Sequence, residues 1–118
     1  MPVPNRTFRL LSVESGSTLR ITLHGELDRA TIITLAQELR ECERRAMSVV
    51  VLDLSDLEFL DGLAFRVLLD FARRLRRHGR HLSLVNPSRE VRRILAVSAI
   101  VHEADVLDEW LEGAKPSP

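Results

Sequence analysis

The chain is poor in aromatic residues and in cysteine, and it has no excess of charge of either sign. Its 118 residues include no Tyr, one Trp, four Phe and one Cys. A single cysteine, Cys42, cannot form an internal disulfide, which is typical of proteins from a reducing compartment. Seventeen basic and seventeen acidic residues balance to a formal net charge of zero. No overall field therefore favours nucleic acid or an anionic membrane as a partner.

No segment is typical of targeting or of membrane insertion. The start, Met1 to Asn5, lacks the apolar core of a signal peptide, and no apolar run is long enough to span a bilayer. We therefore expect a cytoplasmic protein without membrane insertion. A chain of 118 residues fits one domain, which we place at residues 5–112, followed by a flexible tail at 113–118.

Apolar and polar residues alternate near the start of the chain in a way that predicts a β-hairpin. Residues 19–24 alternate strictly, as in a strand with one buried face. Residues 8–14 are apolar-rich but lose the alternation at Leu10 and Leu11, which predicts an edge strand with an irregularity. Gly16 lies between the two segments and is expected in the turn.

Helical and extended segments alternate along the rest of the chain. Apolar residues at helical spacing follow Asp28 and Asp61, and the apolar run Val49–Leu52 is typical of a strand covered on both faces. The remaining predicted elements are a strand at 81–84, a short helix after Ser88, a strand at 100–103 and a closing helix at 106–111. Strands separated by helices require right-handed crossovers. The predicted fold is α/β, a single domain with a mixed sheet, an N-terminal hairpin and about four helices.

Asp28 and Asp61 each precede a predicted helix, where a side-chain cap is favoured. A carboxylate at this position accepts hydrogen bonds from the unpaired amide groups of the first helical turn. We therefore interpret both residues as N-caps. A capped helix start is also an exposed and oriented edge, so a cap and a partner contact are compatible roles for the same residue.

Three segments of this chain together resemble the STAS domain family, which includes the bacterial anti-sigma factor antagonists. The three are the strand-to-helix turn at 23–28, the central strand and its end at 49–61, and the late loop and helix at 86–95. Their order and spacing carry the resemblance, which extends over residues 8–111. The resemblance implies a STAS fold and a partner-binding surface flanked by Asp28 and Asp61.

The resemblance also bears on regulation by phosphorylation. In the phosphoregulated members it implies two Ser and a Gly after the Asp that corresponds to Asp61, with the second Ser phosphorylated. Without gaps, Leu63 matches that second Ser and Gly62 the first, whereas a shifted register would match Gly62 and Leu63 to the family's Gly-Leu. Neither register leaves a hydroxyl group at this place. We predict that Asp28, Asp61, Gly62 and Leu63 form a partner surface without the usual phosphorylation site. Leu63 is expected to be partly exposed and to contact the partner, whereas Phe65 is expected in the core.

The function implied by the resemblance is that of a noncatalytic protein-binding regulator. Such a protein sequesters an anti-sigma factor of the serine-kinase type and so influences sigma-dependent transcription. An alternative is a STAS subunit of a lipid-transport ABC system or of a stress-signalling scaffold. A third is a sensor that holds a nucleotide or lipid near the helix N-termini. The oligomeric state stays open, with a homodimer among the alternatives.

Other patterns give no support for catalysis, metal binding or nucleic-acid binding. Ser55 and Ser88 are interpreted as a turn residue and an N-cap, and only weakly as replacement phosphosites. Basic residues cluster from Arg73 to Arg93 without interleaved aromatic residues, which favours a solvated face, or an acidic partner groove, over nucleic acid. Cys42 falls on an apolar helical stripe and is expected in the core. The His residues lack metal-ligand spacing, and no cofactor is expected.

Overall fold

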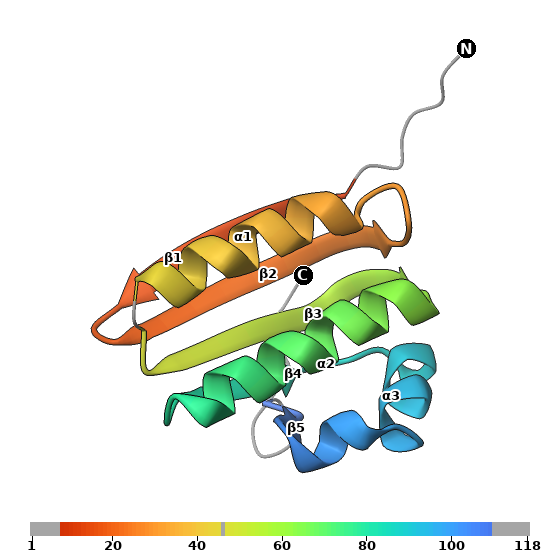
Figure 1. Ribbon diagram of the computed structural model, residues 1–118. Helices are drawn as coiled ribbons and strands as arrows, with labels where there is room; N and C mark the ends of the chain where they lie inside the picture. The colour runs from red at the N-terminus through yellow and green to blue at the C-terminus, as the bar shows by residue number, and fades with distance from the viewer. Residues whose placement is uncertain (1–7, 46, 110–118) are drawn as a thin grey trace.

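A computed structural model describes residues 8–45 and 47–109 of the chain (Figure 1). Five strands, three α-helices and one 3-10 helix occur in this part of the chain. In chain order they are β1 (Arg9–Ser15), β2 (Thr18–Leu27), α1 (Ile32–Arg44), β3 (Val49–Leu60), α2 (Gly62–Arg77), β4 (His81–Val85), α3 (Arg89–Ala96), η1 (Ala99–His102) and β5 (Asp105–Leu107).

The strands form one mixed sheet in the order β1-β2-β3-β4-β5. β1 is antiparallel to β2, and each later strand is parallel to the one before it. The predicted α/β class, the mixed sheet and the N-terminal hairpin are confirmed. The expected number of helices, about four, is one more than the three α-helices of the described part, where η1 is a short 3-10 element.

The hydrophobic core lies between the sheet and the helices α1 and α2, which run along the same face of the sheet (Figure 1). We call this face the inner face and the opposite one the outer face. Alternate residues of β2 and β3 point inward and are completely buried, while apolar stripes on both helices meet them. The fully buried residues of this kind include Leu19, Ile21, Leu23, Val50, Leu52, Leu54, Leu35, Leu68 and Phe71.

The hairpin is more regular than the sequence predicts. β1 pairs with β2 in one continuous register from Arg9↔His24 to Ser15↔Thr18, so the expected irregularity at Leu10 and Leu11 is wrong. Gly16, with a φ of 62°, supplies the left-handed backbone of the connecting turn. The irregularities lie instead between β2 and β3, where the register shifts twice between Thr22 and Glu26.

The C-terminal part of the described chain differs from its prediction. The strand expected at 100–103 is the 3-10 helix η1, because Ile100 turns inward and is completely buried against α3 and the core. The strand that follows, β5, occupies the beginning of the closing helix expected at 106–111. Backbone pairing with β4 decides this outcome, since Ser83, Leu84 and Val85 of β4 are paired with β5. Trp110 and Leu111 lie outside the described residues, as do the expected tail at 113–118 and both limits of the expected domain at 5–112.

An ion-pair network holds the last described residues against the outer face of the sheet. Arg20 of β2 contacts Asp53 of β3 at 2.7 Å and Glu109 at 2.8 Å. Asn86, after β4, accepts a hydrogen bond from the Glu109 amide at 2.8 Å and donates one to the Glu109 carboxylate at 3.2 Å. The network thus joins β2 and β3 to the segments that follow β4 and β5. Arg20 and Asp53 alternate along their strands with the buried inner-face residues. No sequence pattern predicts this network, because its members are far apart in the chain.

Asp53 is the most buried carboxylate of the network, and its environment favours the ionised form. Burial by itself raises the pKa of Asp53, but hydrogen bonds from the Ser55 amide and hydroxyl and from Arg20 outweigh burial. The net result is a pKa below its ordinary value of 3.8. A lowered pKa in the folded state stabilises the fold above the unfolded pKa. This stabilisation is lost as the pH falls through the folded-state value.

Asp53→Asn is expected to lower the free energy of unfolding at pH 7 by about 1–2 kcal/mol, because the buried charged hydrogen bonds are weakened. The loss of stability on acidification below pH 3.8 should also be smaller in this variant, because the titrating group is gone. Urea unfolding at several pH values measures both effects. Glu58→Gln removes an exposed carboxylate of the same strand and is the control, with an expected change within about 0.5 kcal/mol. Equal pH profiles for Asp53→Asn and wild type would contradict the assignment.

Candidate functional site

The turn that follows β2 is organised by the carboxylate of Asp28. Its Oδ1 accepts hydrogen bonds from the amides of Ala30 at 2.9 Å and Thr31 at 3.2 Å. The structure places Thr31 at the N-cap of α1, so the prediction that Asp28 is the N-cap is wrong by three residues. The carboxylate instead caps the turn that leads into the helix. This turn continues directly into α1, because the Ile32 amide donates a hydrogen bond to the backbone carbonyl oxygen of Asp28 at 2.9 Å. The physical role predicted for Asp28 is preserved in this adjoining turn.

Asp61 is the N-cap of α2, as predicted. Its backbone is extended, with φ −91° and ψ 177°, and its carboxylate accepts a hydrogen bond from the Ala64 amide at 2.9 Å. Its own amide donates to the carbonyl oxygen of Leu27 at 3.1 Å. Leu27 directly precedes Asp28, so this bond holds the start of α2 beside the turn that contains Asp28. Asp28 and Asp61, which are 33 positions apart in the sequence, therefore lie at the same end of the sheet.

Apolar side chains are exposed next to these capped turns. Leu63, the second residue of α2, is 47% exposed, in agreement with the prediction that it is partly accessible. Ile33, the second residue of α1, is 64% exposed, and Phe59 near the end of β3 is 47% exposed. Phe65 is partly buried and packs against the core, as expected. We call Asp28, Asp61, Gly62 and Leu63 the capped edge.

Ile33 and Phe59 were not identified from the sequence as site residues. Strict alternation in β3 would place Phe59 on the same face as the buried Leu57. The register shift between Gly25 and Glu26 breaks this alternation, so Phe59 is exposed while Leu60 is buried. No local sequence pattern signals such a shift. Ile33 extends the apolar stripe of α1 in the sequence, and only the packing of the helix shows that it faces outward.

The start of α2 has no hydroxyl group, and the nearby serines are engaged in local structure. Positions 62–64 are Gly, Leu and Ala. The Ser55 hydroxyl donates to Asp53 at 2.8 Å, and the Ser88 hydroxyl accepts from the Val91 amide at 3.1 Å as the N-cap of α3. A Cβ atom added at Gly62 would meet nothing within 4 Å. The absence of a side chain at position 62 is therefore not imposed by packing.

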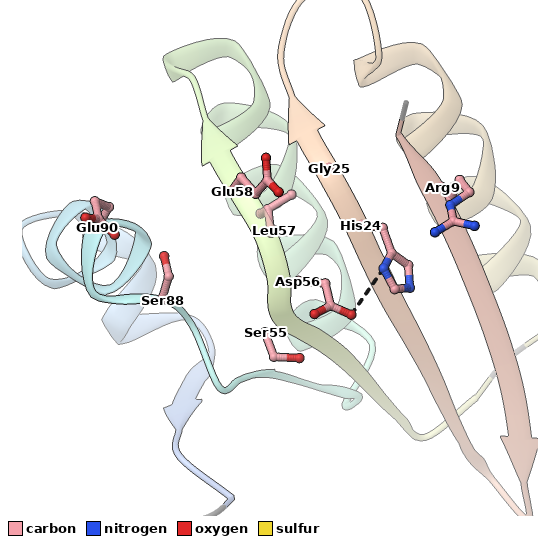
Figure 2. Close-up of a pocket in the computed structure, with 9 residues that line it drawn as sticks. All are labelled: Arg9, His24, Gly25, Ser55, Asp56, Leu57, Glu58, Ser88 and Glu90. Atoms are coloured by element: carbon pink, nitrogen blue, oxygen red, sulfur yellow. Dashed lines mark ion pairs between the residues drawn. The ribbon is translucent and has the colours of Figure 1, made fainter. Parts of the chain in front are cut away.

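A groove of about 930 Å³, lined mostly by polar residues, opens between strands β1 to β3 and the start of α3 (Figure 2). Its lining comes from β1, β2, β3 and the start of α3, and includes the ion pair between His24 and Asp56 at 3.1 Å. Glu58 and Glu90 add two carboxylates to the lining, against one further cation, Arg9. This excess of carboxylates disfavours a phosphate-bearing ligand, so the groove gives no support to the nucleotide-sensor alternative.

The described residues contain no cluster that could hold a metal ion, and the cysteine among them is buried. Within 8–45 and 47–109, no group of three or more His, Cys, Asp or Glu residues is placed to hold a metal ion. Cys42 is buried in the core as predicted, and burial, reinforced by the Glu38 carboxylate, raises the pKa of its thiol to about 11. A thiol with such a raised pKa is a poor nucleophile at neutral pH. No helix in the described part of the chain is both long and apolar enough to cross a membrane.

Several arginines of the basic cluster are paired within the protein. Arg74 contacts Glu43 at 2.7 Å, and Glu103 contacts Arg76 at 3.1 Å and Arg73 at 3.7 Å. These internal pairs reduce the positive charge that α2 presents to a ligand. They agree with the interpretation of the cluster as a solvated face.

Comparisons with known proteins connect this geometry to one family. A family model described as the STAS domain matches residues 10–109. An anti-sigma factor antagonist from Mycobacterium paratuberculosis is similar in structure, with a TM-score of 0.79, 18% identity and coverage of 88% of each chain. SpoIIAA in its unphosphorylated form gives a TM-score of 0.70 at 21% identity, covering 90% of this chain and 92% of that one. The phosphorylated form of the Bacillus protein SpoIIAA gives 0.69 at 22%, covering 86% and 90%. Comparison with curated proteins finds no match to this sequence.

Replacing either capping carboxylate is expected to destabilise the protein. Asp28→Ala and Asp61→Ala should each lower the free energy of unfolding by about 1 kcal/mol, because backbone amides of the turn before α1 and of the first turn of α2, respectively, lose their acceptor. Asp28→Asn and Asp61→Asn are the matched controls, since an amide oxygen also accepts these bonds.

Leu63→Asp should change stability by no more than about 0.5 kcal/mol, because the side chain is half exposed. Urea unfolding measures all five variants, and wild-type stability in both alanine variants would contradict the capping roles.

Proposed function

The chain belongs to the STAS domain family, and from this premise we propose that it is a noncatalytic, cytoplasmic, protein-binding regulator. Its proposed partner is an anti-sigma factor of the serine-kinase type. By sequestering this factor, the protein would release a sigma factor and so influence transcription. The likeness in fold to anti-sigma factor antagonists supports the proposal.

The capped edge is the observation that carries the proposal. Two turns from distant parts of the sequence are joined by the bond from the Asp61 amide to the Leu27 carbonyl oxygen. Their carboxylates fix the local backbone, so the exposed Leu63 and Phe59 are presented by a rigid support. Exposed apolar side chains on an ordered backbone are well suited to protein association, because little conformational entropy is lost on binding.

The proposed binding is constitutive with respect to phosphorylation at the start of α2. A phosphate group would add nearly two negative charges to this surface. Gly62, Leu63 and Ala64 have no hydroxyl group to accept it, and the surface around Leu63 remains apolar. One structural relative, the Bacillus protein SpoIIAA, exists in a phosphorylated form. We propose that this chain keeps the binding surface without such a switch.

Leu63→Asp is expected to weaken binding to a serine-kinase anti-sigma factor from the source cell at least tenfold, because a charge replaces an apolar contact. The control is Val101→Asp, which places the same charge at a residue of similar exposure, 41%, on η1. Affinity capture from a detergent-solubilised lysate of the source cell identifies the partner, and calorimetric titration of the purified partner measures the affinities. Equal binding by Leu63→Asp and wild type would contradict the surface. Capture of an ABC transporter in place of an anti-sigma factor would contradict the partner and favour the transport alternative.

Incubation of the wild-type protein with the partner kinase and ATP is expected to give no phosphate on residues 61–64. The variant with Gly62→Ser and Leu63→Ser should become a substrate, because it places hydroxyl groups at an exposed helix start. The fold should tolerate the change, since the added side chain at position 62 meets no neighbouring atom. Intact-mass spectrometry with peptide mapping measures the phosphate. Wild-type phosphorylation at Ser55 or Ser88 would overturn the proposal of an unswitched binder. A variant that folds and binds the kinase, yet stays unmodified, would contradict the correspondence of these positions to the phosphorylation site.

A further inference from the structure

Strand β1 is a long, open edge of the sheet with few of the features that prevent edge-to-edge association. Within residues 8–45 and 47–109 it pairs only with β2. It spans seven residues, contains neither Pro nor Lys, and has charged residues only at Arg9 and Glu14. Its register with β2 has no bulge. On the outer face it exposes Leu11 by 60% and Val13 by 65%. Edge strands of this kind are templates for pairing with another strand.

The turn of the hairpin determines which backbone groups of β1 point away from β2. The connection Gly16-Ser17 is a two-residue turn, and in such hairpins the flanking residues, Ser15 and Thr18, form a hydrogen-bonded pair. Counting back by two along β1, the odd-numbered residues bond to β2. The N–H and C=O groups of Leu10, Ser12 and Glu14 therefore point to the open edge.

We propose that β1 pairs with β1 of a second copy of this chain, antiparallel and with a two-fold axis beside Ser12. In this register Ser12 lies opposite Ser12 of the second copy, and Leu10 lies opposite Glu14. All three outward-facing residues of each copy then form hydrogen-bonded pairs. Leu11 lies opposite Val13 of the second copy on the outer face, twice by symmetry, and the close spacing of this non-hydrogen-bonded pair brings the exposed apolar side chains together.

Helix α1 fits the same arrangement. It lies over β1 and β2, where Glu38 accepts a hydrogen bond from the Ser12 hydroxyl and Arg45 contacts Glu14 at 2.7 Å (Figure 1). Neighbouring strands are about 4.8 Å apart, so the two α1 helices of the dimer would be about 10 Å apart. This is an ordinary distance for packed helices. The interface would therefore include a helix pair as well as the paired strands.

The proposed dimer is closed and leaves the capped edge accessible. The two-fold axis uses the β1 edge of both copies, and the remaining edge, β5, has only three residues. Figure 1 shows α2, which carries Leu63, on the β3 and β4 side of the sheet, away from β1. One dimer would thus present two partner-binding surfaces. The inference rests on β1 and on helix α1 above it, and it is independent of the partner proposed above.

The first test is the oligomeric state of the purified full-length chain by sedimentation equilibrium over a range of concentrations. Wild type should approach a dimer, and Val13→Lys should raise the dissociation constant at least tenfold. Val97→Lys, at a residue 85% exposed at the end of α3, should leave the dissociation constant unchanged. Wild type that stays monomeric at every concentration, or a Val13→Lys variant that associates like wild type while folding normally, would overturn the proposal.

The second test determines the register with a short thiol-specific crosslinker. Two Ser12→Cys chains should crosslink efficiently, because residue 12 lies about 5.5 Å from its copy between Cα atoms. Two Ser15→Cys chains should not, because the copies of residue 15 lie about 20 Å apart along the strands. Wild type is the background control, since its Cys42 is buried. Equal crosslinking of the two variants would overturn the register even if a dimer forms.

Discussion

The candidate site depends on the parallel pairing of β2 with β3. This pairing runs from Thr18 beside Val49, through the buried pair Leu19 and Val50, to Leu27 beside Leu60. At its end the Leu27 carbonyl oxygen accepts a hydrogen bond from the Asp61 amide. The backbone hydrogen bonds between β2 and β3 are thus continued to the start of α2. The turn at Asp28 and the helix start at Asp61 are therefore positioned by the most buried part of the molecule. Backbone geometry rather than side-chain contact brings them together.

This constraint explains why the two capping carboxylates should not act as independent residues. Each orders a turn, and the turns share a hydrogen bond at Leu27. Loss of one cap would loosen the support of the other, so their effects on stability are expected to be non-additive, as for residues within one network. A partner that contacts either turn would therefore sense the order of both.

The elements with strong periodicity could be predicted from the sequence, because their burial follows from their own residues. The alternation in residues 19–24 and the apolar stripe after Asp61 correspond to β2 and α2. The segment from Ile100 to Leu107 could not be predicted in the same way. Its single fully buried residue, Ile100, fits several conformations, and β5 is defined by pairing with β4 rather than by its own pattern. Long-range pairing outweighs local preference in such short segments.

The candidate site shows the same division. Asp61 could be predicted as a cap because capping is a local feature, and the partial exposure of Leu63 is expected from the family resemblance. Phe59 could not be predicted, since its exposure depends on the register shift between β2 and β3. The pairing of Arg20 with Asp53 and Glu109 depends on which strands are adjacent and on where the chain runs after β5. The spacing of these residues in the sequence therefore could not predict that Arg20 pairs with the two carboxylates.

The attachment of Glu109 to Arg20 has a consequence for shortened forms of the chain. Glu109 lies 89 positions after Arg20, and every buried residue of the hydrophobic core cluster precedes Glu109 in the sequence. Removing Glu109 and the residues after it would therefore release the attachment without deleting a single residue of this cluster. The change in stability on such a truncation measures what the attachment contributes, separately from the core.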